Sequence, residues 1–203
     1  MLGHELRNPL AAIASAAEVI RLQSADDRRW RRVHDVLSRQ TAHMTGIIDG
    51  LLDVSRIERG KITLERRPLE LSALLRSALA DREADARRRG IELTAELTAS
   101  PCWVSGDEIR LAQVFDNLLT NALKFTDRGG RVTLRLSGAD PWARAEVVDT
   151  GVGLRAELIP YLFQPFQQER QNIARSSGGL GLGLALVRGL VELHGGHVEA
   201  ESE

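Results

Sequence analysis

A helical repeat of apolar positions dominates the N-terminal part of the chain. From Leu2 to Arg21, apolar residues return at alternating steps of four and three, which is typical of a helix that buries one seam. A second helical stretch runs from Asp27 to Glu58, and the polar letters QSADD before it predict a short turn with Asp26 or Asp27 as the N-cap. Gly60 is the expected C-cap of this helix. The seam of the second helix includes Trp30, Val33, Leu37, Met44, Ile47, Leu51 and Val54.

The two predicted helices form a hairpin that needs a partner. Two helices alone bury too little apolar surface to be stable, so a hairpin from a second copy is the natural completion. We therefore expect a homodimer through a four-helix bundle, with residues 1–66 as the first domain.

After Pro68 the pattern changes to alternating helices and strands, which predicts a second domain over residues 67–203. The mixture indicates an α+β fold, in which one mixed sheet is covered by helices as an α/β sandwich. The segment from Leu154 to Gly178, where only IPYLF looks helical, is longer than a usual connection and is typical of a lid. The expected helices are Leu71–Arg89, Asp107–Leu123 and about Gly181–His194, and the expected strands are Ile91–Thr98, Val132–Leu136 and Arg144–Val148.

Composition and charge exclude several classes of protein. The formal net charge of the 203 residues is −1, so no overall basic field favours nucleic acid, and RRWRR and RRR are interpreted as solvated faces. Cys102 is the only cysteine, which excludes an internal disulfide framework and a cysteine-cluster metal site. No apolar run reaches the roughly 18 residues that span a bilayer, and no signal peptide is visible. We expect a cytoplasmic fragment without membrane contact.

The stretch HELRNPL places a histidine beside a carboxylate on the first predicted helix. His4 lies opposite the apolar seam and faces water, with Asn8 one turn further along and Glu5 on its flank. Pro9 lacks the N–H that would bond the carbonyl of Glu5, so the helix should bend or loosen there. A neutral imidazole has a lone pair that can attack an electrophile, and an adjacent carboxylate can orient the ring. A solvated His-Glu pair without chemistry is the alternative.

The stretch DNLLTNALKFT brings amides and an ammonium onto one face of a predicted helix. Asn117, Asn121 and Lys124 share this face with Arg110 and Gln113. Mg²⁺ keeps most of its waters and needs only one or two protein oxygens, which an asparagine carbonyl can give, while a lysine contacts phosphate as a point charge. A polar face in water is the alternative.

The stretch DTGVG starts with a carboxylate at the end of a predicted strand. Gly151 and Gly153 allow a sharp turn and let a flat ligand approach the backbone, and Asp149 can accept a hydrogen bond from an adenine amine. A simple strand-to-loop turn explains these glycines equally well.

The stretch GGLGLGL leads into the last predicted helix. Free N–H groups at a helix start, approached without obstruction by a Cβ, suit phosphates. The repeat follows a long loop instead of a strand, so it is neither the dinucleotide fingerprint nor a P-loop.

The order of these stretches resembles the catalytic core of a sensor histidine kinase, over nearly the whole chain. HELRNPL resembles the H box of that family, DNLLTNALKFT its N box, DTGVG its G1 box, FQPF from Phe163 its F box and GGLGLGL its G2 box. Leu180 stands where many relatives carry a smaller or hydroxyl residue, a feature common in hybrid-type members. The resemblance implies a dimerisation and histidine phosphotransfer hairpin followed by a Bergerat-type ATP-binding domain. The family's first helix normally continues upstream and a further strand usually follows the end, so we expect an excised core with a truncated C-terminal strand.

The same resemblance implies roles for three residues of the hairpin. His4 would be the phosphoacceptor and Glu5 its acid/base partner. Asn8 would belong to the Glu-x-x-Asn pattern that the family links to dephosphorylation of the response regulator.

In the ATP-binding domain, the resemblance makes Asn121 the Mg²⁺ ligand and Asp149 the adenine anchor. The expected ATP-binding residues are Asn117, Asn121, Lys124, Asp149, Gly151, Gly153, Phe163, Phe166, Gly179, Gly181 and Gly183. Of these, the last three glycines would cradle phosphate at the hinge of the lid, and the two phenylalanines would pin the lid.

The resemblance thus implies ATP-dependent autophosphorylation of His4 and phosphoryl transfer to an aspartate of a response regulator. One alternative is a gyrase- or chaperone-like ATPase, which shares the ATP motifs but needs no exposed His-Glu pair on a hairpin. The other is a catalytically silent scaffold that dimerises and binds partners.

Overall fold

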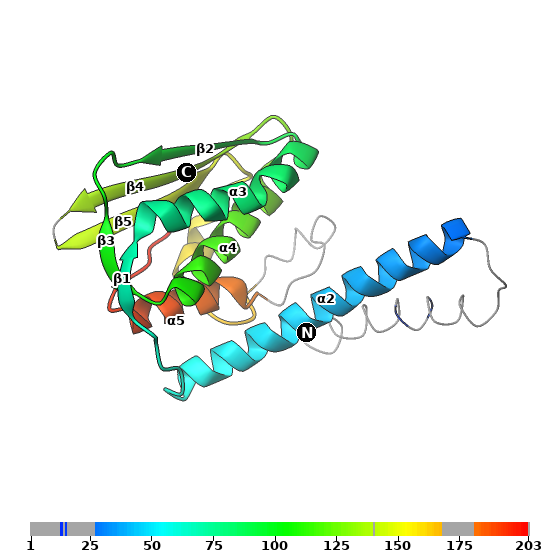
Figure 1. Ribbon diagram of the computed structural model, residues 1–203, viewed down its shortest axis with the longest axis horizontal. Helices are drawn as coiled ribbons and strands as arrows, with labels where there is room; N and C mark the ends of the chain where they lie inside the picture. Colours follow the sequence, from blue (N-terminus) through cyan, green and yellow to red (C-terminus); the bar gives the residue numbers. More distant parts are fainter. Residues whose placement is uncertain (1–12, 14, 16–26, 140, 168–180, 203) are drawn as a thin grey trace.

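The computed structural model describes residues 13, 15, 27–139, 141–167 and 181–202 (Figure 1). Most of the helix predicted for residues 2–21 lies outside this set, and with it His4, Glu5 and Asn8. Gly179 of the glycine stretch lies outside it as well. Among the described residues, no helix combines the length and the apolar character needed to cross a membrane.

The second predicted helix is confirmed as α2 (Asp27–Glu58), a helix of 32 residues that stands beside the rest of the described chain (Figure 1). Gly60 has a φ of 61°, and the N–H of Lys61 donates to the carbonyl of Arg56 at 2.8 Å, so the helix ends through a left-handed glycine as expected. The C-terminal half of α2 packs against the last helix, and Val54 and Ile57 join an apolar cluster there. Part of the seam that we assigned to the hairpin therefore faces another part of this chain.

The described residues between 67 and 202 form two layers, which we call the sandwich. Its main sheet has the order β2 (Glu92–Leu97), β4 (Arg131–Ala139) and β5 (Trp142–Asp149), with β2 and β4 parallel and β4 and β5 antiparallel. Two helices, α3 (Leu71–Arg89) and α4 (Glu108–Phe125), cover one face of this sheet (Figure 1). The predicted α+β class with a mixed sheet under helices is confirmed.

A second, smaller sheet was not predicted. It joins β1 (Arg67–Glu70) and β3 (Trp103–Gly106) as an antiparallel pair in which Leu69 lies opposite Val104. At the last residue of β1, the Glu70 carboxylate caps α3 by accepting hydrogen bonds from the backbone N–H groups of Ser72 and Ala73. This pair therefore closes the sandwich beside the start of α3, and the expectation of a single sheet was incomplete.

The sandwich is completed by η1 (Ala156–Tyr161), a short 3₁₀ helix in the predicted lid, and by α5 (Gly183–Leu193). Leu186, Val187 and Leu190 of α5 are buried with Val114 of α4, so these two helices share one core. Residues 195–202 follow α5 without a regular strand, and the N–H of Leu154 donates to Ser202 Oγ at 2.8 Å.

Asp107 holds together the linker, the start of α4 and the end of α5. Its carboxylate caps α4 by accepting from the N–H of Arg110 at 3.2 Å, and it also accepts from the N–H of Glu65 at 3.0 Å. The N–H of Asp107 donates to Nε2 of His194 at 3.0 Å. Contacts with the linker and with the end of α5 therefore fix the start of α4, the helix that carries the N box.

Asp107→Ala is expected to lower the free energy of unfolding by about 1 kcal/mol, the usual cost of a lost N-cap. Partial burial acts to raise the pKa of Asp107, but the N–H groups of Glu65 and Arg110 outweigh it and hold this pKa below its ordinary value. The stabilisation is therefore complete above the unfolded pKa of about 3.9 and is lost as the pH falls through the lower folded pKa.

Urea unfolding at pH 7 and near pH 3 measures this effect, because the difference between wild type and Asp107→Ala should shrink in acid. Asp107→Asn is the control, since it keeps an acceptor for the N–H of Arg110 and does not titrate. An Asp107→Ala difference that stays the same at both pH values would contradict the role of the ionised cap.

Candidate nucleotide-binding site

The polar face of α4 is the base of the candidate site. Asn117, Asn121 and Lys124 follow one another along this face at intervals of about one turn, and all three are half-buried. The opposite face of the same helix is apolar, and Phe115, Leu119 and Ala122 are among its buried members. The predicted amphipathic arrangement of the N box is therefore present.

Asn117 connects α4 to the start of α5. Its Nδ2 donates to the backbone carbonyl of Gln113 at 2.8 Å, which fixes the orientation of the amide. A Cβ at Gly183 would lie 2.7 Å from Oδ1 of Asn117, closer than real contacts allow. A side chain at position 183 would therefore displace the Asn117 amide from this orientation.

The turn after β5 lies against the other end of α4. Oδ1 of Asp149 accepts from the N–H of Gly151 at 2.8 Å, and the Asp149 side chain is exposed. A Cβ at Gly151 would lie 2.6 Å from the backbone carbonyl oxygen of Phe125, the last residue of α4. Gly153 has a φ of 67°, in the left-handed region that favours glycine. These glycines therefore do more than form a generic turn, since Gly151 allows the strand end to touch the N-box helix.

Phe166, inside the predicted lid of residues 154–178, and Gly181, just after that segment, lie next to each other. The N–H of Phe166 donates to the carbonyl of Gly181 at 3.1 Å, and a Cβ at Gly181 would lie 2.5 Å from the carbonyl oxygen of Gln167. Gly181 has a φ of 68° and Phe166, unusually for a phenylalanine, one of 66°. The structure thus joins Phe166 and Gly181 through their backbones.

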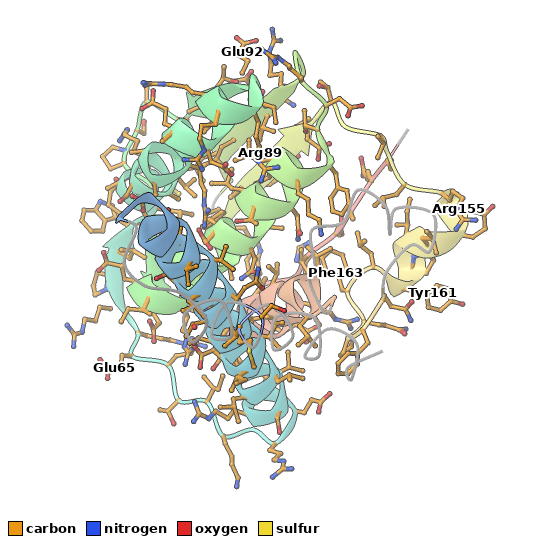
Figure 2. All side chains as sticks on the ribbon, turned by 90° about the vertical axis from the view of Figure 1, so that its right-hand side faces the viewer. Glu65, Arg89, Glu92, Arg155, Tyr161 and Phe163 are labelled. Atoms are coloured by element: carbon orange, nitrogen blue, oxygen red, sulfur yellow. The ribbon has the colours of Figure 1, made fainter. Side chains whose placement is uncertain are left out.

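The two phenylalanines of the F box differ in their surroundings. Phe163 is half-buried, whereas the side chain of Phe166 is 44% exposed. In Figure 2, Arg155 and Tyr161 lie at the outer side of η1, and Phe163 lies further toward the helices. The side chain of Phe163 is therefore the better placed of the two to hold this segment by packing.

The donor set suits Mg²⁺ bound mainly through phosphates. Among the described residues there is no group of three or more His, Cys, Asp or Glu side chains that could hold a metal ion by themselves. Asn121 offers an amide oxygen of the kind that Mg²⁺ accepts together with waters and phosphate oxygens. The Lys124 ammonium lies above the ring of Phe125, 5.1 Å from its centroid.

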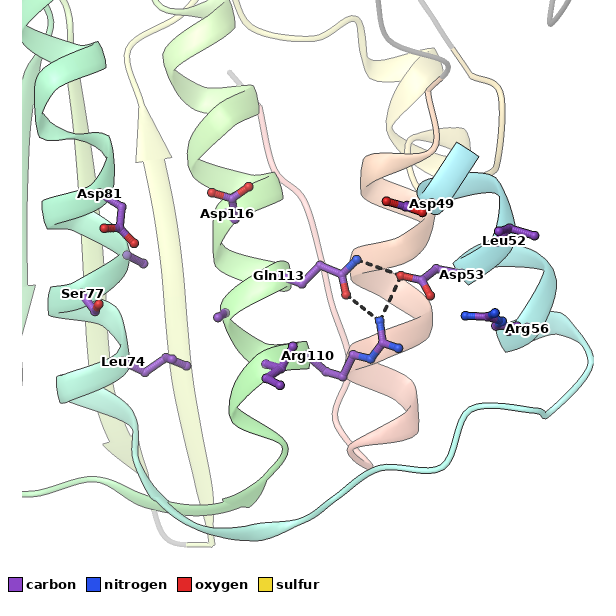
Figure 3. Close-up of a pocket in the computed structure, with 13 residues that line it drawn as sticks. Asp49, Leu52, Asp53, Arg56, Leu74, Ser77, Asp81, Arg110, Gln113 and Asp116 are labelled. Carbon is purple, nitrogen blue, oxygen red and sulfur yellow. Dashed lines mark hydrogen bonds and ion pairs between the residues drawn. The ribbon is translucent and has the colours of Figure 1, made fainter. Parts of the chain in front are cut away.

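One polar group near this site was missed from the sequence. Asp53 of α2 bonds to Arg110 and Gln113, which the sequence had placed on the face of the N box without a role (Figure 3). These three residues border a groove of about 670 Å³ between α2, α3 and α4, and the lining of this groove contains no residue of the predicted ATP-binding set. In the sequence, the feature that could have indicated this cluster was the position of Arg110 and Gln113 on the polar face of the N-box helix.

Comparison with known proteins gives two family matches. Residues 1–60 match the family model of the His Kinase A (phospho-acceptor) domain, and residues 106–203 match that of the Histidine kinase-, DNA gyrase B-, and HSP90-like ATPase. The autoinducer 2 sensor kinase/phosphatase LuxQ of Vibrio cholerae is 34% identical over 206 residues, which are 100% of this chain and 24% of LuxQ. A sensor-like histidine kinase of Rhizobium meliloti is 35% identical over 99% of this chain and 39% of its own length. The chain therefore spans well under half the length of these curated relatives.

Solved structures agree with these matches. The mycobacterial sensor histidine kinase MprB is 33% identical, with 64% of this chain and 80% of MprB covered and a TM-score of 0.54. The histidine kinase ThkA, in a complex with the response regulator protein TrrA, has the same fold over 100% of this chain and 56% of ThkA, with a TM-score of 0.74 and 21% identity. With the H-box and N-box regions both inside matched family models, the chain belongs to the sensor histidine kinases and forms the catalytic core of such a protein.

Proposed function

We propose that this core transfers the γ-phosphoryl group of ATP to His4 and then to an aspartate of a response regulator. The observation that carries the proposal is the convergence of three motifs on α4. Asn117 meets Gly183 at the start of α5, and Phe125 meets Gly151 after β5. A single helix thereby holds the proposed adenine, metal and phosphate groups in one place.

Each group has a defined task in the proposed site. The Asp149 carboxylate accepts a hydrogen bond from the adenine amine, and the close approach of Gly151 to Phe125 holds the turn that carries this carboxylate against the end of α4. The N–H groups at the start of α5 face phosphate, since Gly181 and Gly183 carry no side chain there. Mg²⁺, held by Asn121, would neutralise charge on the phosphates.

In the transfer step, a ring nitrogen of His4 attacks the γ-phosphorus in line with the bond to the β-phosphate oxygen. The N–P bond forms as the P–O bond breaks, and ADP leaves with the electron pair. Glu5 orients the ring and takes up its proton. Positioning and charge neutralisation supply most of the catalysis, as is general for phosphoryl transfer.

We also propose that the core works as a homodimer, with residues 1–66 as the dimerisation and phosphotransfer domain and residues 67–203 as the ATP-binding domain. The match to the phospho-acceptor domain supports the first part. Ile48 on α2 is 46% exposed in the single chain, which suits a helix face that a second copy covers. A response regulator is the proposed partner, and the complex of ThkA with TrrA supports this choice.

Incubation with ATP labelled at the γ-phosphate tests the proposed function. Phosphohistidine is acid-labile and base-stable, so label on the protein should be lost in acid and kept in base. A gyrase-like ATPase would release phosphate without labelling the chain, and a silent scaffold would bind no nucleotide in calorimetry. Either result would replace the proposal.

A second activity, dephosphorylation of the response regulator, is favoured by Asn8 and by the kinase/phosphatase name of LuxQ. The Asn8 amide can orient a water at a phospho-aspartate, an electrophile that needs a positioned nucleophile more than a strong base. Asn8→Ala should leave autophosphorylation of His4 within a few-fold and slow loss of phosphate from the cognate regulator at least about tenfold. Unchanged dephosphorylation by this variant would show that Asn8 is only a surface residue.

A further inference from the structure

The side chain of His194 joins the end of α5 to the start of α4. Its Nε2 accepts from the backbone N–H of Asp107 at 3.0 Å, and its Nδ1 lies 2.8 Å from the carbonyl oxygen of Leu190, one turn earlier on α5. A backbone N–H only donates and a carbonyl oxygen only accepts, so Nε2 must lack a proton and Nδ1 must carry one. The two bonds therefore select a single neutral tautomer of the ring.

A second contact between the same helices lies at their other end. There, Gly183 at the start of α5 lies against Asn117 of α4, since a Cβ at position 183 would come to 2.7 Å from Oδ1 of Asn117. The start of one helix thus meets the end of the other (Figure 1). At the helical rise of 1.5 Å per residue, the two contacts are about 15 Å apart along each helix. The structure therefore ties α5 to α4 at both ends.

Between these two contacts the helices meet through apolar side chains. Val114 of α4 is buried with Leu186, Val187 and Leu190 of α5. Apolar burial is non-directional, whereas a hydrogen bond requires a defined distance and angle. The bond from Asp107 to His194 therefore adds a directional constraint on the register of α5 along α4.

The register of α5 decides where the proposed phosphate site lies relative to the N box. The N–H groups at the start of α5 are the proposed phosphate donors, and Asn121, the proposed Mg²⁺ ligand, lies one turn beyond Asn117 on α4. Protein interiors are close-packed and transmit displacements, so a shift at His194 moves the start of α5 against these amides. The adenine side differs, because the turn of Asp149 is held at the other end of α4, against Phe125.

We propose that His194 is a positioning residue for phosphate binding, whose neutral ring sets the register of α5 on α4 and thereby places the phosphates beside the N box. The inference rests on the proposed function, because it takes ATP to bind at this site. The alternative is that His194 only caps α5 through its bond to Leu190. That role would not need the bond from Asp107, so the two ring nitrogens must be tested separately.

His194→Gln and His194→Asn separate the two bonds. Gln places its amide near the position of Nε2 and keeps an acceptor for the N–H of Asp107, whereas Asn reaches only the position of Nδ1. His194→Asn should bind ATP at least about fivefold more weakly in calorimetry, as loss of one hydrogen bond predicts, and His194→Gln should stay within about twofold of wild type. Wild-type affinity in His194→Asn would overturn the proposal.

His197→Asn is the matched control, since it makes the same substitution three residues later at a side chain that is 78% exposed. Its ATP affinity should stay within about twofold of wild type. A loss as large as that of His194→Asn would show that the effect does not come from the bond to Asp107, and would contradict the proposal.

Adenosine separates placement of the phosphates from general loosening of the sandwich. This ligand has no phosphate, and its proposed anchor is Asp149, whose turn does not contact His194. In titrations followed by NMR, His194→Asn should bind adenosine within about twofold of its wild-type affinity. Equal losses for adenosine and ATP would overturn the positioning role.

Two measurements without nucleotide separate failure of this inference from failure of the proposed function. Nitrogen NMR of the His194 ring should show a proton on Nδ1 and none on Nε2. Amide hydrogen exchange at Asp107 should be at least about fivefold faster in His194→Asn than in wild type, and unchanged in His194→Gln. A proton on Nε2, or unchanged exchange in the Asn variant, would overturn the inference even if ATP binds. A wild-type protein that binds no nucleotide would overturn the proposed function and with it the role in phosphate binding, while the expected exchange would still establish the junction of α4 and α5.

Discussion

His4→Gln is expected to abolish ATP-dependent phosphorylation of the protein while ATP binding survives. The variant lacks the ring nitrogen that forms the N–P bond, whereas the proposed nucleotide contacts lie on α4, α5 and the turn after β5. Acid-labile label measures the first quantity, and calorimetric titration with ATP measures the second.

His197→Gln is the matched control, because it removes another histidine, one that is 78% exposed in its side chain and lies after α5. It should be labelled as wild type is. If His4→Gln still carried acid-labile label, the phosphoacceptor would be another histidine and the assignment of HELRNPL as the H box would be wrong.

Gly151→Ala and Asp149→Asn are expected to weaken ATP binding at least about tenfold, as the loss of one charge-assisted hydrogen bond predicts. In the first variant, the new Cβ would lie 2.6 Å from both Oδ1 of Asp149 and the carbonyl oxygen of Phe125, so the turn must move off the end of α4. In the second, an amide replaces the carboxylate that accepts the adenine amine.

Gly138→Ala provides the control for the glycine substitution, since a Cβ there meets nothing within 4 Å. Its ATP affinity should match that of wild type. Calorimetry at one salt concentration compares all four proteins, and circular dichroism checks that each is folded. Wild-type affinity in both Asp149→Asn and Gly151→Ala would place the nucleotide elsewhere.

Local patterns predicted the long elements well. The bounds of α2 and α3 agree with the predicted ranges, and Asp107 precedes α4 as its cap. A strong helical period, a capping residue and a C-terminal glycine are signals that lie within the element itself. The same property placed Asn117, Asn121 and Lys124 on one face.

The small sheet was missed because its information is not local. β1 has four residues, includes a proline and shows no clear alternation, and its partner β3 lies more than thirty residues away. Strands this short are stabilised by pairing and by burial of Leu69 and Val104 against the core, which only the folded chain supplies.

The residues that pack against the apolar seam of α2 could not be predicted from the sequence either. The helical spacing of Ile47, Leu51 and Val54 correctly predicted a buried face of α2. It could not show which residues cover that face, and in the structure Leu182 covers part of it. Asp53 illustrates the same limit, since its burial depends on Arg110, 57 residues further along the chain.

The bond between Phe166 and Gly181 has a consequence for how this family can diversify. Because the chain enters and leaves the segment at one hydrogen-bonded pair, the residues inserted between these ends can change in number without displacing η1 or α5. The cost of a longer insertion is mainly loop entropy, which grows slowly with length. Relatives that differ in the number of residues between these two positions should therefore keep the same register of α5 on α4, with the residue equivalent to Gly183 against the one equivalent to Asn117.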